Sequence, residues 1–372
     1  MEREMSDKAD GEYGKSVVRA AEEVPAPTIE YLPPMPRSFR PKIGLTGAGG
    51  ITEYHLRAYR KMGLGVVAIC DVDPKRAEQR RDEFYPAAEL FTSYEDVLKR
   101  DDVDVVDIAT HPEERVAIIR TAIEARKHVL SQKPFVVDLG IGRELAALAD
   151  QNNVQLAVNQ NGRWSPHFGY MARAVQQGII GELASIDFVL HWDHTWTGGT
   201  PFEGIHHLLL YDFAIHWFDI TVAMLGDIPV KSVFASVART SYQTIKPPFM
   251  AQVAIECGGD ETPSVQVRMC FNAHVQYGQE DRTIVAGSNG TMRAFGPALN
   301  DQQVQVWTDA GYARPKLEGD WFDNGFRGTM GELLCAIEDD RQPWNNAREN
   351  LRSLELCFAA MKSADSGEVV RL

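Results

Sequence analysis

A regular alternation of short apolar runs and amphipathic segments constrains the fold more than any other feature of this sequence. It begins at Lys42, where the apolar run KIGLTG leads into glycines, and it continues to Asn161. The runs GVVAICD and VDVVDIAT are each followed by a stretch with helical spacing. Near-continuous apolar runs predict buried parallel strands with helices on both faces of the sheet. We therefore expect residues 41–162 to form a doubly wound α/β domain with a parallel sheet.

The second half of the chain has a different rhythm. After about Gly162, strands dominate, as in KSVFASVART, MAQVAIECGG and SVQVRMCFNAHVQ. Asn289-Gly290 is a typical hairpin signal. Residues 163–372 are therefore expected to form an α+β domain with a large, mainly antiparallel open sheet that binds substrate. Its apolar strands suggest a sheet face that the expected helices leave uncovered, which favours pairing into a homodimer or homotetramer.

Residues 1–40 are predicted to form an arm, because six of the nineteen prolines lie between Pro25 and Pro41. Proline at that density favours extended backbone. Two interpretations remain open. The arm is either a floppy tail, or it packs on its own domain or a neighbouring subunit through the apolar side chains of IEYLPPM. Met5 is a candidate for the original start.

Composition excludes several classes of protein. Asp and Glu number 52 against 38 Lys and Arg, for a net charge of −14, which argues against nucleic-acid binding and against a polybasic membrane anchor. No stretch approaches the length of about 20 apolar residues that spans a bilayer. The N-terminus lacks the apolar segment of a signal peptide. Five widely spaced cysteines without a CxxC pair indicate reduced thiols, so we expect a cytoplasmic protein.

A glycine-rich turn is the first motif that carries chemistry. Gly47, Gly49 and Gly50 follow the first strand, and Ile51 opens a helix. Glycines there allow a tight turn and close approach to a pyrophosphate, to which the helix N-terminus offers N–H groups. Thr52 stands where the pattern usually has Gly or Ala. In this strand–turn–helix context the motif predicts a Rossmann domain, and an ordinary glycine turn is the alternative.

Asp71 ends the second strand, 24 positions after Gly47. A carboxylate at that position can accept hydrogen bonds from both ribose hydroxyls of NAD and would repel a 2′-phosphate. Lys75 and Arg76 are close by, and Arg76 is a candidate cofactor contact that keeps NADP open as the less favoured choice. The alternative role for Asp71, capping the next helix, suits Asp73 better.

Two further motifs carry titratable side chains. Lys133, in SQKP, follows an apolar strand whose carboxyl end should face the ligand crevice, where an ammonium positions or acidifies a substrate hydroxyl. In YDFAIHWFD, spacings of four and three place Asp212, His216 and Asp219 on one helical face. The functional interpretation is a base poised near neutral pH with a carboxylate that orients it or the substrate. A surface lysine and a structural pair are the alternatives.

Aromatic and histidine side chains are concentrated between residues 164 and 217. The set consists of Trp164, Trp192, Trp196 and Trp217 with His167, His191, His194, His206, His207 and His216. Aromatic faces over C–H bonds and imidazoles that reach hydroxyls suit a sugar pocket, and Trp164 and His194 are candidate substrate contacts. Ordinary core packing is the alternative.

No metal site is expected from these histidines. On a strand, His191 and His194 would point to opposite faces, and His206 and His207 are adjacent in sequence. The chain also lacks an HExxH pair.

Together these motifs resemble the Gfo/Idh/MocA family, which includes glucose–fructose oxidoreductase and inositol dehydrogenase. The resemblance covers about residues 40–372. The family's Glu-Lys-Pro motif is matched by QKP around Lys133, and its Asp-x-x-x-His motif by Asp212 and His216. The resemblance implies that Lys133 is the catalytic lysine, that Asp212 orients the substrate and that His216 transfers a proton.

The same resemblance implies further contacts and shows two departures. Thr110, His111, Gln132 and Lys133 are implied in cofactor binding, and Arg163 in NQNGRW is implied near the nicotinamide and the substrate. Gln132 stands where the family has glutamate, and the sequence EER follows THP where the family often carries Pro-x-x-x-His.

The implied reaction is hydride transfer between a carbinol carbon of a sugar or polyol and NAD. The favoured substrate is an aldose that is oxidised to its lactone, and a branched pentose such as D-apiose is one candidate. Two alternatives stay open: a glycosidase of the same family that retains its NAD, and a non-catalytic NAD-dependent sensor.

Overall fold

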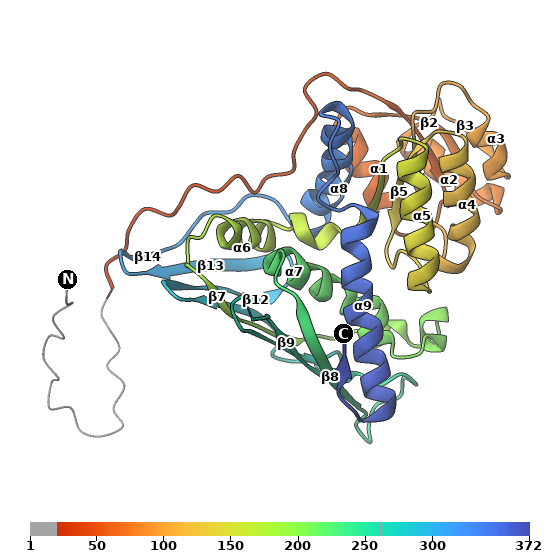
Figure 1. The fold of residues 1–372 in the computed structure, drawn as a ribbon. Coiled ribbons are helices and arrows are strands. Elements are labelled where there is room, and N and C mark those ends of the chain that lie inside the picture. The colour runs from red at the N-terminus through yellow and green to blue at the C-terminus, as the bar shows by residue number, and fades with distance from the viewer. Residues whose placement is uncertain (1–20, 261) are drawn as a thin grey trace, which may run out of the picture.

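The structure is a computed structural model, and it describes residues 21–260 and 262–372. The proposed start at Met5 and the first half of the proline-rich arm lie outside the described residues. Two sheets organise the described chain, one of six strands and one of nine (Figure 1). No helix in these residues combines the length and the apolar character needed to cross a bilayer.

The first sheet confirms the predicted parallel α/β domain. Its strand order is β3-β2-β1-β4-β5-β6, and every neighbouring pair is parallel. The strands are β1 (Lys42–Thr46), β2 (Gly65–Cys70), β3 (Glu89–Phe91), β4 (Val105–Ile108), β5 (His128–Gln132) and β6 (Leu156–Asn159). The helices between them are α1 (Thr52–Lys61), α2 (Pro74–Phe84), α3 (Tyr94–Leu98), α4 (Pro112–Glu124) and α5 (Leu139–Gln151).

The second sheet confirms the predicted large, mostly antiparallel sheet. Its order is β14-β13-β12-β11-β7-β10-β9-β8-β15, and only β7 and β10 pair in parallel among its described strands. The strands are β7 (Leu183–His191), β8 (Val230–Ala238), β9 (Met250–Cys257), β10 (Val265–Asn272), β11 (Glu280–Gly287), β12 (Gly290–Ala298), β13 (Asp301–Thr308), β14 (Gly311–Ala313) and β15 (Val370–Arg371). The expected hairpin joins β11 to β12, with Ser288 and Asn289 at its turn.

Helices α6 (Pro166–Gln176), α7 (Ile215–Leu225) and α9 (Ala347–Ser366) lie on one side of this sheet (Figure 1). The other side is open and carries both polar and apolar side chains. Exposed positions alternate with buried ones along β9 and β10, and they carry Gln252, Ala254, Glu256, Gln266 and Arg268, while Phe234 of β8 is also exposed on this side, opposite Ala254. The strands obey the period of two that puts apolar side chains under the helices. The predicted oligomer stays a prediction.

The described part of the arm, residues 21–40, packs on its own chain. It runs along the edge of β14 and then passes α8 (Trp321–Glu338) before β1 begins (Figure 1). Ile29 is buried, the hydroxyl of Tyr170 donates to Pro27 O at 2.9 Å, and Ser38 N donates to Glu338 at 2.7 Å. Of the two interpretations of the arm, the structure favours packing on its own domain.

The hydrophobic core of the parallel sheet also includes residues from beyond residue 162. Helix α8 comes from the second half of the chain, yet its Phe326, Met330 and Leu333 join the core of the parallel sheet with Leu45 and Tyr59. Four short helical turns complete the described fold: η1 (Asn161–Trp164), η2 (Thr195–Thr197), η3 (Pro201–Gly204) and the π-helical η4 (Leu209–Phe213).

Candidate active site

A cavity of about 650 Å³ lies where the carboxyl ends of β4 and β5 meet the second domain. Ligands in open α/β sheets bind at this edge. From the parallel domain it is lined by Ile51, Ala109, Thr110, His111, Pro112, Arg115, Gln132, Lys133 and Pro134. From the rest of the chain it is lined by Asn161, Trp192, His194, Trp196, Pro201, Phe202, Ile205, Tyr211, Asp212, Phe213, His216, Trp217, Leu299, Trp321, Phe322 and Phe326.

The glycine turn has the shape that a pyrophosphate needs. Gly47 has a φ of +89°, and a Cβ there would lie 2.8 Å from the backbone of Ala109, so only glycine suits the position. At Gly49 and Gly50 a Cβ would meet nothing within 4 Å, which leaves open space above the turn. Helix α1 begins directly after it. These residues fit the dinucleotide that the sequence predicts.

Asp71 is buried, and its carboxylate holds the loops beside the turn. Its two oxygens accept the backbone N–H groups of Ala48 at 2.7 Å and of Asp73 at 2.9 Å. A carboxylate oxygen has lone pairs left for a further donor. Arg76 is exposed, and its Nε lies 3.7 Å from Asp73, so its guanidinium is paired with its own helix start.

Lys133 and Asp212 meet across the cavity. The Lys133 Nζ donates to Asp212 Oδ1 at 3.1 Å and to the backbone oxygen of Asp212 at 2.8 Å. Both side chains are mostly buried, 17% and 16% exposed, so the ion pair is poorly screened by water. The ammonium that the sequence placed at the carboxyl end of β5 is therefore held by the second domain.

His216 lies one helical turn after Asp212 and lines the same cavity. Burial, reinforced by the charge of Lys133, holds the pKa of His216 well below its usual value of 6.5. Its Nδ1 has no hydrogen-bond partner within the described residues. The imidazole is therefore uncharged at neutral pH, and it is a weaker base than the one poised near neutral pH that the sequence suggested.

A π-helical turn separates the members of the YDFAIHWFD motif. The turn η4 carries Asp212, and the regular helix α7 begins only at Ile215. The wider turn changes the angle between Asp212 and the residues of α7, whereas His216 and Asp219 keep regular helical spacing. Asp212 and His216 face the cavity, but Asp219 does not, which corrects the prediction that all three share one functional face.

The predicted sugar-pocket aromatics divide into two groups. Trp192, Trp196, Trp217 and His194 line the cavity, and burial lowers the pKa of His194 to about 4. Trp192 stacks on His194 with ring centroids 5.0 Å apart. Trp164 is fully buried and packs edge-on against Trp344, outside the cavity lining.

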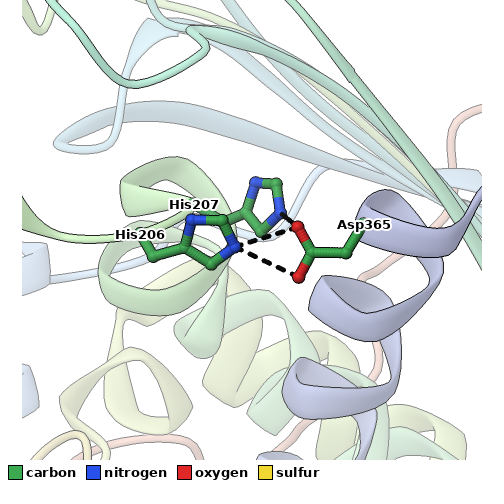
Figure 2. A group of neighbouring side chains, drawn as sticks. All are labelled: His206, His207 and Asp365. Carbon is green, nitrogen blue, oxygen red and sulfur yellow. Dashed lines mark hydrogen bonds and ion pairs between the residues drawn. The ribbon is translucent and has the colours of Figure 1, made fainter.

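The remaining histidines of this region also lie outside the cavity lining. His167 is buried in α6, and His191 lies on β7. The side chains of His206 and His207 both point toward Asp365 of helix α9 (Figure 2).

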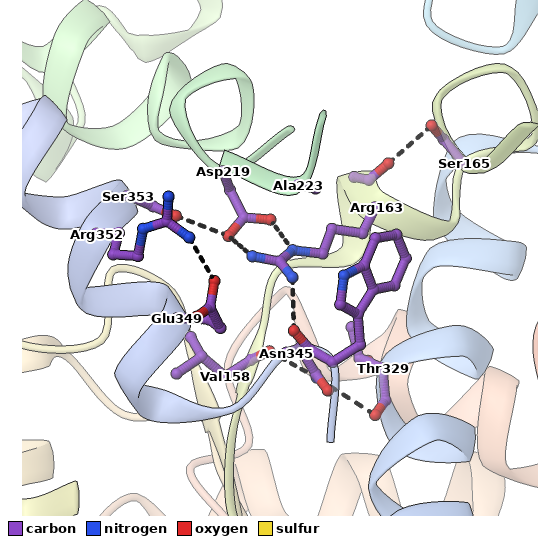
Figure 3. A network of polar contacts seen from close by, with 12 residues as sticks. Val158, Arg163, Ser165, Asp219, Ala223, Thr329, Asn345, Glu349, Arg352 and Ser353 are labelled. Carbon is purple, nitrogen blue, oxygen red and sulfur yellow. Dashed lines mark hydrogen bonds and ion pairs between the residues drawn. The ribbon is translucent and has the colours of Figure 1, made fainter. Parts of the chain in front are cut away.

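Arg163 is not brought to the cavity either. Its Nε and Nη2 donate to the two oxygens of Asp219 at 2.5 and 2.9 Å, and its Nη1 donates to Trp344 O at 2.6 Å (Figure 3). Ser353 of α9 donates to Asp219 Oδ1 at 2.9 Å. The predicted contact with nicotinamide and substrate is therefore replaced by a buried brace between η1, α7 and α9.

Gln132 belongs to a buried network that the sequence did not reveal. Its Oε1 accepts the backbone N–H of Lys133 at 2.6 Å, so its amide nitrogen faces His55 Nε2 at 3.0 Å as a donor. His55 Nε2 must then be an acceptor, which puts the imidazole proton on Nδ1, 2.7 Å from Asp107 Oδ2. The Tyr59 hydroxyl donates to the same carboxylate oxygen at 2.7 Å.

Arg115 and Tyr211 are two cavity residues that sequence reasoning missed. Arg115 is buried, and its guanidinium donates to the backbone oxygens of Thr110, Gln132 and Pro134, which ties together the loops after β4 and β5. Burial lowers the pKa of Arg115 to about 9 and raises the pKa of Tyr211 to about 12. The only sequence signal for Arg115 was its place in the atypical EER segment.

Comparisons with known proteins agree with this geometry. A family model described as "Oxidoreductase family, NAD-binding Rossmann fold" matches residues 41–160, and the GFO/IDH/MocA C-terminal domain model matches residues 168–293. The D-apiose dehydrogenase of Paraburkholderia graminis is 25% identical, with 89% of each chain covered. The inositol 2-dehydrogenase of Rhizobium meliloti is also 25% identical, covering 87% of this chain and 96% of that protein.

Solved structures share the fold. An oxidoreductase from Agrobacterium radiobacter in complex with NAD⁺, L-tartaric acid and magnesium superposes with a TM-score of 0.79 at 21% identity, covering 90% of this chain and 98% of that one. The scyllo-inositol dehydrogenase from Lactobacillus casei gives 0.75 at 19% identity, with 90% and 99% covered. The two family models together span more than half of the sequence. The chain therefore belongs to the Gfo/Idh/MocA family of NAD-dependent oxidoreductases, in which D-apiose and inositol dehydrogenases are its relatives.

Proposed function

We propose that this protein is an NAD-dependent dehydrogenase that oxidises one hydroxyl of a sugar or polyol, with an aldose and its lactone as the favoured pair. The observation that carries the proposal is the meeting of Lys133, Asp212 and His216 in one aromatic-lined cavity at the carboxyl edge of the parallel sheet. A basic imidazole, an ammonium and a carboxylate are the groups that manage a proton during alcohol oxidation.

Each side chain has a distinct part in the proposed reaction. His216 takes the proton of the reacting hydroxyl, because its imidazole is neutral and faces the cavity. Lys133 donates a hydrogen bond to the same oxygen and stabilises the charge that develops there. Asp212 holds the ammonium in place and accepts a hydrogen bond from a neighbouring hydroxyl. NAD, when bound, supplies the hydride acceptor, and the carbinol becomes a carbonyl.

The cavity lining favours a compact polyhydroxylated substrate. Trp196 is 57% exposed and offers apolar ring surface to C–H bonds, and His194 offers a ring nitrogen to a hydroxyl. Trp192 and Trp217 also line the cavity but are almost fully buried. Burial holds the pKa of His194 at about 4, so this contact is uncharged at neutral pH. The D-apiose and inositol dehydrogenases match this chain at the same 25% identity, and a branched pentose such as D-apiose is our preferred candidate among aldoses.

The test is a substrate panel followed at the absorbance of reduced nicotinamide. D-apiose, other aldoses and inositols are each offered with NAD and with NADP, and trapping of the product with hydroxylamine separates a lactone from an open-chain ketone. The proposal expects NADH to accumulate with at least one free sugar or polyol, and His216→Ala should slow that accumulation by about a hundredfold or more. Turnover of glycosides without net NADH would favour the NAD-retaining glycosidase. NAD binding without turnover of either class would favour the sensor.

A further inference from the structure

Three ligand-type side chains converge outside the cavity, on the surface between the 204–208 loop and helix α9. His206 Nε2 lies 2.9 and 3.1 Å from the two carboxylate oxygens of Asp365, and His207 Nε2 lies 2.8 Å from Oδ1 (Figure 2). The donor atoms of the three residues all lie within 4.8 Å of one another. Within the described chain, this is the one group of three or more such side chains with that spacing.

The backbone of His207 explains why two adjacent histidines face one point. His207 has a φ of +49°, in the left-handed region that residues other than glycine rarely adopt. In extended backbone, neighbouring side chains point to opposite faces, which is why the sequence argued against a shared ligand. The left-handed turn places the two imidazoles side by side, with ring centroids 4.0 Å apart.

We infer that His206, His207 and Asp365 form a binding site for a divalent transition-metal ion of the zinc class. Two imidazoles and one carboxylate are a ligand set that zinc accepts, with water in the fourth position. Tetrahedral zinc with ligands at about 2.1 Å places its donor atoms about 3.4 Å apart. The present distances from each Nε2 to the Asp365 carboxylate are a few tenths of an ångström shorter, and the exposed side chains of His206 and Asp365 can open by that amount.

The ion takes the place of protons that now lie between the nitrogens and the carboxylate. In a neutral imidazole, the hydrogen on an Nε2 that donates to Asp365 moves to Nδ1 when Nε2 binds metal, whereas an imidazolium must first release a proton. The zinc affinity therefore falls as the pH drops into the range where imidazoles are protonated.

The location gives the site a structural consequence. His206 and His207 lie between Ile205 and Tyr211, both of which line the active-site cavity. An ion shared with Asp365 ties this wall of the cavity to helix α9. The segment continues into η4, which carries Asp212. The metal would thus stabilise the wall that presents Asp212 to Lys133, without contacting the reacting atoms.

The experiment measures zinc binding directly on tag-free, chelator-treated protein. Equilibrium dialysis gives the stoichiometry, and a chromogenic chelator gives the affinity. The inference expects one zinc per chain and a higher melting temperature with zinc, as ligand binding to the folded state requires. Cobalt(II) provides a second readout, since tetrahedral coordination gives strong visible absorption bands.

Substitutions of the proposed ligands test where the zinc ion binds. His206→Ala and Asp365→Asn should each weaken zinc binding by at least about a hundredfold, because even groups behind a ligand contribute ten- to a hundredfold. His274→Ala, a control at a histidine outside this cluster, should bind zinc as the unchanged protein does. Circular dichroism shows whether each variant is folded. Undiminished zinc affinity in both ligand variants, or no binding at micromolar zinc, overturns the inference.

Discussion

Lys133 and Asp212 are joined by a hydrogen bond of 3.1 Å that spans the junction between the two domains. Lys133 follows the last residue of β5 in the parallel sheet, whereas Asp212 belongs to the π-helical turn η4. Each side chain is held in position by its partner from the other domain. The proposed chemistry therefore depends on how the two domains are packed together.

The first prediction concerns Lys133 and His216 as a unit. Lys133→Ala and His216→Ala should each lower kcat by about a hundredfold or more, because each removes one half of the proton management at the reacting oxygen. The double variant should lose far less than the product of the two effects. NAD affinity, measured by fluorescence titration, should survive His216→Ala. Near-normal kcat in either single variant would remove this mechanism.

The second prediction concerns the pH profile. Burial and the charge of Lys133 lower the pKa of His216, so the base stays neutral as the pH falls through 6.5. The acid limb of kcat/KM for the unchanged protein should therefore lie well below pH 6.5. Lys133→Met removes the positive charge and should move that limb to higher pH, on top of a lower plateau. Identical limbs in both proteins would show that another group titrates.

The third prediction concerns the network behind Lys133. Gln132→Ala removes the acceptor of the Lys133 N–H and should lower kcat by about tenfold, in line with other groups that orient a functional residue. The KM for NAD should change little. Asn159→Ala is the matched control: Asn159 Nδ2 lies 3.2 Å from the same His55 nitrogen, but Asn159 makes no hydrogen bond to Lys133. Equal losses of kcat in the two variants would reduce the network to a structural role.

These positions show how far the sequence predicts the structure. Apolar runs and their period predicted both sheets, because the burial of one or both faces of a strand determines the spacing of apolar residues along it. The motifs around Lys133, Asp212 and His216 predicted residues that the fold brings together, since each lies at a strand or helix position with a defined direction. The network of His55 and Asp107 could not be predicted from the sequence, because its residues come from separate helices and strands that only the fold brings together.

The predicted contact of Arg163 with nicotinamide and substrate was wrong for a related physical reason. Its motif predicted a position at the end of β6 but not the direction of a long side chain with several rotatable bonds. The partner that decides the direction is Asp219, 56 residues away in sequence. The same motif helix was expected to carry Asp219 to the cavity, but Asp219 is buried and accepts hydrogen bonds from Arg163 instead. Long-range ion pairs and local helix irregularities leave little trace in a single sequence.

The fourth prediction follows from that brace. Arg163→Met leaves the carboxylate of Asp219 buried without its guanidinium partner, and loss of one member of a buried ion pair costs about 3–5 kcal/mol. The free energy of unfolding from urea titration should fall by that amount. Arg163→Met with Asp219→Leu should recover much of the loss, because no buried charge remains. A stable single variant with a raised substrate KM would restore the predicted contact between Arg163 and substrate.

The fifth prediction is the choice of cofactor, which depends on Asp71. The hydroxyls of a ribose at the end of β2 donate charge-assisted hydrogen bonds to the carboxylate, whereas a 2′-phosphate meets a like charge that costs several kcal/mol. We therefore expect kcat/KM for NAD to exceed that for NADP by about a hundredfold, or roughly 2.7 kcal/mol. Steady-state kinetics with both cofactors measure the ratio.

Variants at Asp71 separate its two roles. Asp71→Ser should shrink the NAD preference, mostly by weakening NAD binding, and it should also loosen the glycine turn, because the N–H groups of Ala48 and Asp73 lose their shared acceptor. Asp71→Asn keeps one amide oxygen for these donors and removes the charge, so it should relax the discrimination against NADP with less damage to the turn. Arg76→Ala tests whether the nearby positive charge affects cofactor choice. Because the Arg76 side chain is exposed, its removal should change the ratio of kcat/KM for NAD and NADP little. Equal use of both cofactors by the unchanged protein would mean that Asp71 serves the loop alone.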